Sequence, residues 1–252
     1  MVLLKEIRLL FWRKMLETLR EPSWIIAGLS TPLLYLALFL PLLNNLNAPI
    51  FGSGDVLDVF LPGLLALLAF GSGMGAGWGI IFELQSGVIE RFRVSPTRRF
   101  SLLMGTVFRD ILMFIVPAIL VIIVASFFGF QIHWGGILIL LVLQSLFTAI
   151  VSAVSSSLGL ILKDIGSLAA IVTSLQLPIM LLSGVLLPIS LGPNWLQTLA
   201  HINPMYYVVE ASRLLADGVY IDQQIWLAFI IMIPLTIIVL WWSTRVYGKI
   251  VA

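Results

Sequence analysis

The stretch WGGILILLVLQSLFTAIVSAVSSSLGLIL, residues 134–162, contains no charged side chain and decides the class of fold. A helix needs about 20 predominantly apolar residues to cross the hydrocarbon core of a bilayer, and this stretch is longer. The sequence therefore predicts a membrane-spanning helix here, and comparable stretches occur on both sides of it.

The composition of the whole chain also points to a membrane. Of the 252 residues, 60% are hydrophobic and 10% are charged, and the mean hydropathy is +1.11. A soluble domain carries about 25% charged residues, so this chain lacks the polar surface that a water-soluble globule needs. Six spans of about 20 residues would use half of the chain, which leaves no room for a separate soluble enzyme domain. We therefore expect one all-α membrane domain over residues 1–252.

Hydropathy and periodicity divide the chain into six spans and three other elements. The predicted spans are 24–43, 56–81, 102–128, 134–162, 165–189 and 225–242. Residues 1–22 place apolar side chains on one helical face and charged side chains on the other, which predicts an amphipathic helix in the membrane interface. A helix docked on a partner protein is the alternative. Residues 190–222 are too apolar for a free loop and too interrupted for a span, which predicts short external interfacial or re-entrant helices.

The basic residues predict the orientation of these spans. With six spans, every Lys and Arg except Arg213 falls on one side of the membrane. Basic residues accumulate in cytoplasmic segments, and an odd number of spans would break this pattern. We therefore expect both termini to be cytoplasmic, in the plasma or inner membrane of a bacterial or archaeal cell.

The connection after the second span is the most informative charged segment. Residues 83–96 read ELQSGVIERFRVSP, with Leu84, Val88 and Phe92 on one helical face and charged side chains elsewhere. Pro96 ends the helical pattern. Such a helix at the cytoplasmic face can seat a soluble partner, and a solvated positive-inside connector is the alternative.

Two motifs in the chain resemble those of the ABC-2 type transporter permeases. The first is Glu83-x-x-x-Gly87-x-x-Glu90-Arg91-x-x-x-Ser95-Pro96 after a glycine-rich span, and the second is Asn203-Pro204-Met205-Tyr206-Tyr207-x-x-Glu210-x-x-Arg213 before the last span. The resemblance covers nearly the whole chain, and the short first external loop is similar to that of the compact drug, polysaccharide and lipid exporters of the family.

The resemblance implies partners and a role for the first motif. It implies a second permease chain, identical or different, and two ATP-binding cassette ATPase subunits, with membrane lipid around the assembly. The segment after the second span would be the coupling helix that contacts the ATPase. The implied contact residues are Glu83, Gly87, Glu90, Arg91, Arg93 and Pro96.

Several kinds of chemistry are missing from the sequence. There is no G-x-x-x-x-G-K-[ST] phosphate loop, so ATP and Mg²⁺ are expected on the partner ATPase and no cofactor on this chain. The chain has no cysteine, His133 and His201 are far apart, and no H-E-x-x-H or G-x-S-x-G motif occurs, so we expect no metal site and no catalytic residue. No basic stripe with interleaved aromatics stands clear of the apolar runs, which argues against nucleic acid.

The second predicted span carries glycines in two helical registers. Gly71, Gly75 and Gly79 share one face, and Gly73 and Gly77 share another. Small faces let helix backbones approach closely in lipid, so we expect the Gly71, Gly75 and Gly79 face to serve helix packing. A dinucleotide-binding loop is the alternative, but the segment has no strand context.

Proline and glycine near the external side predict a bend. Pro178, Gly184 and Pro188 interrupt the fifth span, and with Asn203 and Pro204 they form a candidate outer gate. A simple kink at a loop entrance is the alternative.

Polar side chains inside the spans have two interpretations. Ser152, Ser155, Ser156 and Ser157 either bind a polar substrate or, as we favour, hydrogen-bond between helices and to their own backbone. The pair Glu210 and Arg213, three residues apart, is expected to be structural. No substrate-binding residue is assigned.

Together these observations predict the transmembrane permease subunit of an ATP-binding cassette exporter. Its cargo would be an amphipathic drug, a lipid, or a lipid-linked or polysaccharide substrate, and the direction of transport follows from the resemblance alone. A self-contained secondary carrier is the alternative, although the sequence places no carboxylate at mid-membrane depth in the six spans. A membrane-embedded enzyme or a scaffold is a third interpretation.

Overall fold

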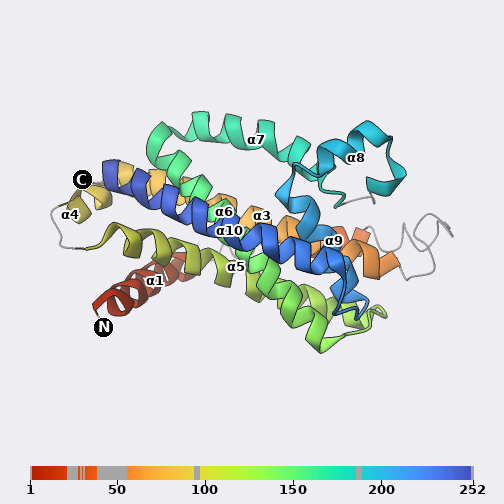
Figure 1. Cartoon of the computed structure of the whole chain (residues 1–252). Helices are drawn as coiled ribbons and strands as arrows, with labels where there is room; N and C mark the ends of the chain where they lie inside the picture. Colours follow the sequence, from red (N-terminus) through yellow and green to blue (C-terminus); the bar gives the residue numbers. More distant parts are fainter. Residues whose placement is uncertain are drawn as a thin grey trace.

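The computed structural model in Figure 1 is a bundle of helices, and it describes residues 2–21, 28, 30, 32–38, 56–93, 97–185 and 189–250. Within these ranges there is no strand. The helices are α1 (Val2–Arg20), α3 (Val56–Gln85), α4 (Val88–Arg93), α5 (Arg99–Phe127), α6 (Trp134–Leu162), α7 (Ile165–Leu182), η2 (Ile189–Leu191), α8 (Asn194–Ala200), α9 (Pro204–Ala216) and α10 (Gln223–Ile250).

Five of the described helices, α3, α5, α6, α7 and α10, are long and apolar enough to cross a membrane. The all-helical membrane fold is therefore confirmed. The predicted first span, 24–43, lies mostly outside the described residues, so the count of six spans stays a prediction. Helices η2, α8 and α9 occupy the segment where short external helices were predicted.

Several predicted boundaries differ from the structure. Helix α6 has the predicted limits, but α3 continues to Gln85 and α10 continues to Ile250. The fifth predicted span ends early, because α7 stops at Leu182 and the chain turns at Gly184, whose φ is +73°. A positive φ of this kind suits glycine and ends the helix.

The two ends of the bundle carry different elements (Figure 1). Helices α1 and α4 and the C-terminal end of α10 lie at one end, and α8 and α9 lie at the other. Helix α3 begins at the α9 end, where the Val59 carbonyl contacts Arg213, and finishes beside α1. Both termini therefore lie at the same end, as they must if an even number of spans separates them.

Helices α3 and α6 form the centre of the bundle, and glycine lets them approach closely. A Cβ added at Gly77 would stand 2.6 Å from Ser155 Oγ, and one at Gly73 would stand 2.9 Å from the Ser152 nitrogen. A Cβ added at Gly71, Gly75 or Gly79 would meet nothing within 4 Å. Among the described residues, the register of Gly73 and Gly77 packs on α6 and the Gly71 face has no close neighbour, so the packing role of that face stays a prediction.

Helix α7 stands apart from the other spans (Figure 1). Of its residues Leu168 and Val172 are buried, whereas Leu175, Leu177 and Leu181 are exposed. An apolar helix with so little covered surface needs lipid or another protein against its outer side.

Candidate functional site

The short helix α4 follows α3 after a tight turn. Gly87 has a φ of +71°, a conformation that glycine adopts without strain, and the turn separates Glu83 in α3 from Glu90 in α4. The single amphipathic segment expected over 83–96 is therefore two elements. Ile89 of α4 is buried at 3% exposure, whereas Glu90 and Arg91 are exposed. One side of α4 thus faces the bundle, and the other offers charged groups to an outside partner.

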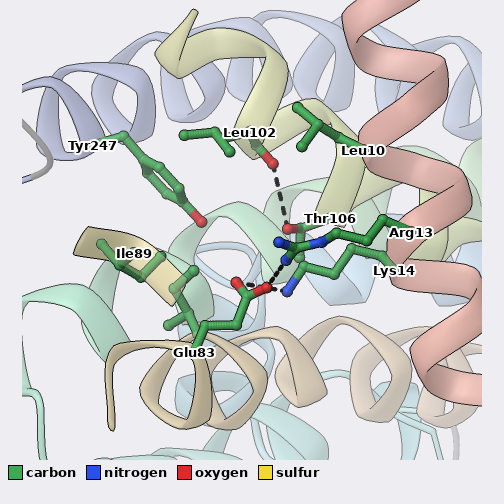
Figure 2. A pocket seen from close by; sticks show the side chains of 9 residues that line it. Leu10, Arg13, Lys14, Glu83, Ile89, Leu102, Thr106 and Tyr247 are labelled. Carbon is green, nitrogen blue, oxygen red and sulfur yellow. Dashed lines mark hydrogen bonds and ion pairs between the residues drawn. The ribbon is translucent and has the colours of Figure 1, made fainter. Parts of the chain in front are cut away.

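Glu83 is buried at the end of α3, in contact with α1. Figure 2 shows Arg13 and Lys14 of α1 directed toward its carboxylate. Lys14 Nζ lies 2.8 Å from Glu83 Oε2, and Arg13 also pairs with this carboxylate. Glu83 therefore binds within the chain, and this contact fixes α1 against the end of α3.

The environment of Lys14 is unusual for a lysine. Burial, and after it the neighbouring Arg109 guanidinium, lower the pKa of Lys14 to about 7. The Glu83 carboxylate, 2.8 Å from its ammonium group, favours the charged form. The carboxylates of Glu17 and Asp110 also favour the charged form of Lys14.

Further contacts connect α1 to α4 and to the beginning of α5. The Arg13 guanidinium lies 4.9 Å from the centre of the Phe92 ring in α4, within the range of a cation–π contact. Ser101 Oγ in α5 donates a 2.9 Å hydrogen bond to Glu6 Oε2 in α1. A Cβ added at Gly105 would stand 2.9 Å from Leu10 Cβ, so α1 and α5 are in close contact. Helices α1, α4 and the adjacent ends of α3 and α5 thus form one packed unit, which we call the junction.

A second buried polar group connects α5 to α6. Asp110 Oδ1 lies 2.5 Å from Arg109 Nη2, and Ser152 Oγ donates a 2.5 Å hydrogen bond to Asp110 Oδ2. Asp110 stands eleven residues beyond Arg99, about 17 Å along the helix at 1.5 Å per residue. The sequence predicted no carboxylate at mid-membrane depth, but Asp110 lies well inside α5, where it is paired.

Four serines of α6 are buried and hydrogen-bonded: Ser152, Ser155, Ser156 and Ser157. Ser155 Oγ donates to the Met74 carbonyl at 2.6 Å and accepts from the Gly77 nitrogen. Ser156 and Ser157 donate to the Ala153 carbonyl in their own helix. The interpretation of these serines as helix-packing and back-bonding groups is confirmed.

At the opposite end of the bundle, Arg213 of α9 connects three elements. Its guanidinium donates to the Val59 carbonyl of α3 at 3.3 Å, to Glu210 at 2.6 Å, and to the Gly184 carbonyl at 2.5 Å. Burial lowers the pKa of Arg213, and the Glu210 carboxylate opposes this effect. The expected structural pairing of Glu210 with Arg213 is confirmed, and it holds the turn after α7 in place.

The residues of the candidate outer gate are only partly brought together. Asn203 caps α9 by accepting from the Met205 nitrogen, and its Nδ2 donates to the Ile179 carbonyl of α7 at 2.7 Å. Pro204 is the first residue of α9, and Pro178 lies inside α7. Pro188, like Pro96 of the coupling segment, lies outside the described residues, and so does the side chain of Arg93. Whether these residues open and close stays a prediction.

Sequence reasoning missed the role of Lys14 and Arg13, which were assigned only to the charged face of an interface helix. Their partner Glu83 is about 70 residues away, and nothing local marks the pairing. The signal available was a carboxylate at the end of a span beside a cluster of inward basic residues. No group of three or more His, Cys, Asp or Glu side chains that suits a metal occurs among the described residues.

These features, a bundle of apolar helices with a short charged helix at one end, define a helical membrane protein. The model of the ABC-2 type transporter family matches residues 5–215, and the chain belongs to that family. Its members are transport permeases, the membrane components of ABC transporters.

Curated relatives support this assignment. A protein named as a transport permease, ycf38, of Cyanophora paradoxa is 27% identical over 215 residues, which are 84% of this chain and 74% of the relative. The protein of the same name from Pyropia yezoensis is 26% identical over 86% of this chain and 76% of its own length. The daunorubicin resistance ABC transporter permease protein DrrB1 of Streptomyces coeruleorubidus is 23% identical over 82% of this chain and 73% of its own length.

Proposed function

We propose that this chain is the transmembrane subunit of an ATP-driven exporter, with six spans and both termini in the cytoplasm. Two such chains, identical or different, would work with two ATPase subunits that hold ATP and Mg²⁺. The observation that carries the proposal is the two-sided nature of α4: Glu90 and Arg91 are exposed, while Ile89 is buried against the bundle. Charged residues on one side of α4 suit a soluble partner of complementary charge.

The six-span topology is supported by the positions of the described ends. Helix α1 lies beside the end of α3, whereas α3 begins at the opposite end, and a further span before α3, which the apolar stretch 24–43 predicts, fits these positions. One more crossing added to the five described spans makes six. Almost all basic residues then lie at the end that carries α4.

The junction suggests how movement of the ATPase would reach the spans. A displacement of α4 acts on α1 through Phe92 and Arg13, and on α3 through the short Gly87 turn. The ion pairs of Glu83 join α1 to α3, so the helices of the junction would move together. Interactions of this kind couple two sites only if the connected elements have two arrangements, and ATP binding would select between them.

The uncovered surfaces support a second permease chain. Only Leu168 and Val172 of α7 are buried, and the Gly71, Gly75 and Gly79 face of α3 has no close neighbour among the described residues. Helices in lipid associate through small-residue faces of this kind. The packing predicted for these glycines would then occur between chains rather than within one.

The cargo we propose is an amphipathic drug, a lipid, or a lipid-linked or polysaccharide substrate. The exposed surface of α7 is mainly apolar, and the DrrB1 relative is named for resistance to daunorubicin. A secondary carrier is the alternative, because Asp110 is a carboxylate within a span. Its pairing with Arg109 and Ser152 favours a structural role over proton coupling.

Co-purification tests the proposal. The tagged chain is isolated from its native membrane, and an accompanying ATPase is identified and quantified. The double variant Glu90→Arg with Arg91→Glu reverses the exposed charges and should weaken this association, while Arg245→Glu, on the last span, serves as the matched control. Full transport by the isolated chain in proteoliposomes without ATP would support the carrier instead.

A further inference from the structure

A groove lies between the interface helix α1 and the span α5. Its volume is about 340 Å³, and its lining is apolar apart from one arginine. The lining residues are Leu4, Ile7, Arg8, Phe11, Phe108, Ile111, Leu112 and Ile115. Because Ser101 and Gly105 of α5 are already in contact with Glu6 and Leu10, the groove is the part of this interface that the described residues leave open.

The apolar floor of the groove continues along α5 toward the other end of the bundle. Residues 108, 111, 112 and 115 are spaced as one helical stripe, and Ile119 and Ile123 extend this stripe with exposed side chains. Helix α5 has the highest hydropathy of the five candidate spans. A hydrocarbon chain seated in the groove could therefore follow α5 into the bilayer without meeting a charge.

Arg8 supplies a cation at the edge of the groove. It is exposed, and no ion pair or hydrogen bond of its side chain occurs with any described residue. Lys5, three residues earlier, and Trp12, four residues later, are exposed on the same side of α1. Basic and aromatic side chains at this position are typical of a helix in contact with lipid headgroups.

We propose that this groove binds one anionic phospholipid of the cytoplasmic leaflet. One acyl chain lies along the α5 stripe, and the phosphate group accepts hydrogen bonds from the Arg8 guanidinium. The charge complementarity identifies the occupant: an apolar groove alone would take any acyl chain, but an arginine at the groove that pairs with no described residue selects a lipid with net negative charge. The assignment to the cytoplasmic leaflet rests on the proposed orientation.

Native mass spectrometry of the full-length chain tests the site. The chain, stripped of endogenous lipid, is titrated with palmitoyl-oleoyl phosphatidylglycerol and with the matched phosphatidylcholine. The wild-type chain should retain the phosphatidylglycerol in preference to the phosphatidylcholine. Arg8→Ala should weaken the retention of phosphatidylglycerol about fivefold, which is the effect of one basic residue at an anionic surface. Arg20→Ala, an exposed arginine of the same helix outside the groove, should change retention less than about twofold.

Two further variants separate the site from other causes. Arg8→Lys keeps the charge and should restore most of the preference, whereas Leu112→Trp fills the groove and should reduce retention of both lipids. Equal retention of the two lipids by the wild type, or equal effects of Arg8→Ala and Arg20→Ala, would overturn the proposal. A dimer that retains no lipid and is unaffected by Arg8→Ala would show that a second copy covers the groove.

This test does not depend on the ATPase. If the lipid binds but a cysteine at position 90 is labelled from outside the cell, the orientation fails and the site belongs to the outer leaflet. If the lipid does not bind but the ATPase still co-purifies, the proposed function stands and the groove proposal fails.

Discussion

The contact of Glu83 with α1 leads to a quantitative prediction for Glu83→Gln. The Glu83 and Lys14 side chains are 10% and 9% exposed, and removal of one partner from a buried ion pair costs about 3–5 kcal/mol. Arg13, the other partner, is 32% exposed and is screened by water, which favours the lower limit. We therefore expect α1 to detach more easily by about 3 kcal/mol, a factor of about 100 in the equilibrium.

A single cysteine can report this detachment, because the natural chain has none. Met15 lies on the buried side of α1 at 8% exposure, so a maleimide should react slowly with Met15→Cys in the wild-type background. In the Glu83→Gln background the reaction should be up to about 100-fold faster if α1 opens reversibly. Leu16→Cys, on the exposed side, should react at the same rate in both backgrounds and corrects for the reactivity of the thiol.

The effect of pH provides a second test of the same pair. In Glu83→Gln, Lys14 keeps the burial that lowers its pKa to about 7 and loses the carboxylate that favours its ammonium form. The detached helix regains the ordinary lysine pKa of about 10.4 and binds more protons above neutrality, so attachment becomes more favourable as pH rises. The excess labelling should therefore shrink between about pH 6 and about pH 9. Equal labelling of Met15→Cys in both backgrounds at both pH values would refute the role of Glu83.

Three further substitutions test the packing of the bundle, each by reversible unfolding in mixed micelles. Gly77→Ala should destabilise the chain by about 1–3 kcal/mol, because the new Cβ meets Ser155, whereas Gly71→Ala, in open space, should be neutral or slightly stabilising. Arg213→Met should lower the free energy of unfolding by about 3 kcal/mol, because it leaves two carbonyls and a carboxylate without their donor. An unchanged midpoint of the unfolding transition would show that water replaces the guanidinium as donor. Asn203→Ala removes the cap of α9 and the hydrogen bond to α7, and should lower the free energy of unfolding by about 1–2 kcal/mol. The control Asn203→Asp retains the cap and loses only the hydrogen bond to α7.

The structure also changes what a substitution at the outer turn can reveal. Gly184→Leu is not a direct test of the predicted gate. Gly184 has a φ of +73°, and its carbonyl accepts from Arg213. A leucine there would be strained for conformational reasons alone, so loss of export in that variant would not distinguish a gate from a misfolded turn.

Apolar length was the strongest predictor of the fold. Helix α6 has the predicted limits because its apolar residues are followed directly by Lys163 and Asp164, which turn the chain; Asp164 caps α7 through the Ser167 nitrogen. Helix α3 exceeds its predicted limit because Glu83, a charged residue, finds partners on α1. That information lies in tertiary contact and is not present in the local hydropathy.

Periodicity predicted two glycine faces on α3 but could not say which one has a neighbour. Ser155 lies opposite Gly77, and the pairing of the two helices follows from the fold as a whole. Arg213, by contrast, was visible in advance as the exception to the distribution of basic residues. The structure holds Arg213 buried and hydrogen-bonded at the end of the bundle opposite α4.

Labelling of Glu90→Cys with a membrane-impermeant maleimide tests the central claim most directly. The claim is that α4 is a cytoplasmic contact surface for a separate ATPase. The cysteine should stay unlabelled in intact cells, react in inside-out vesicles, and react more slowly when the ATPase is bound. Labelling in intact cells, or reaction in vesicles at a rate that the bound ATPase leaves unchanged, would contradict it.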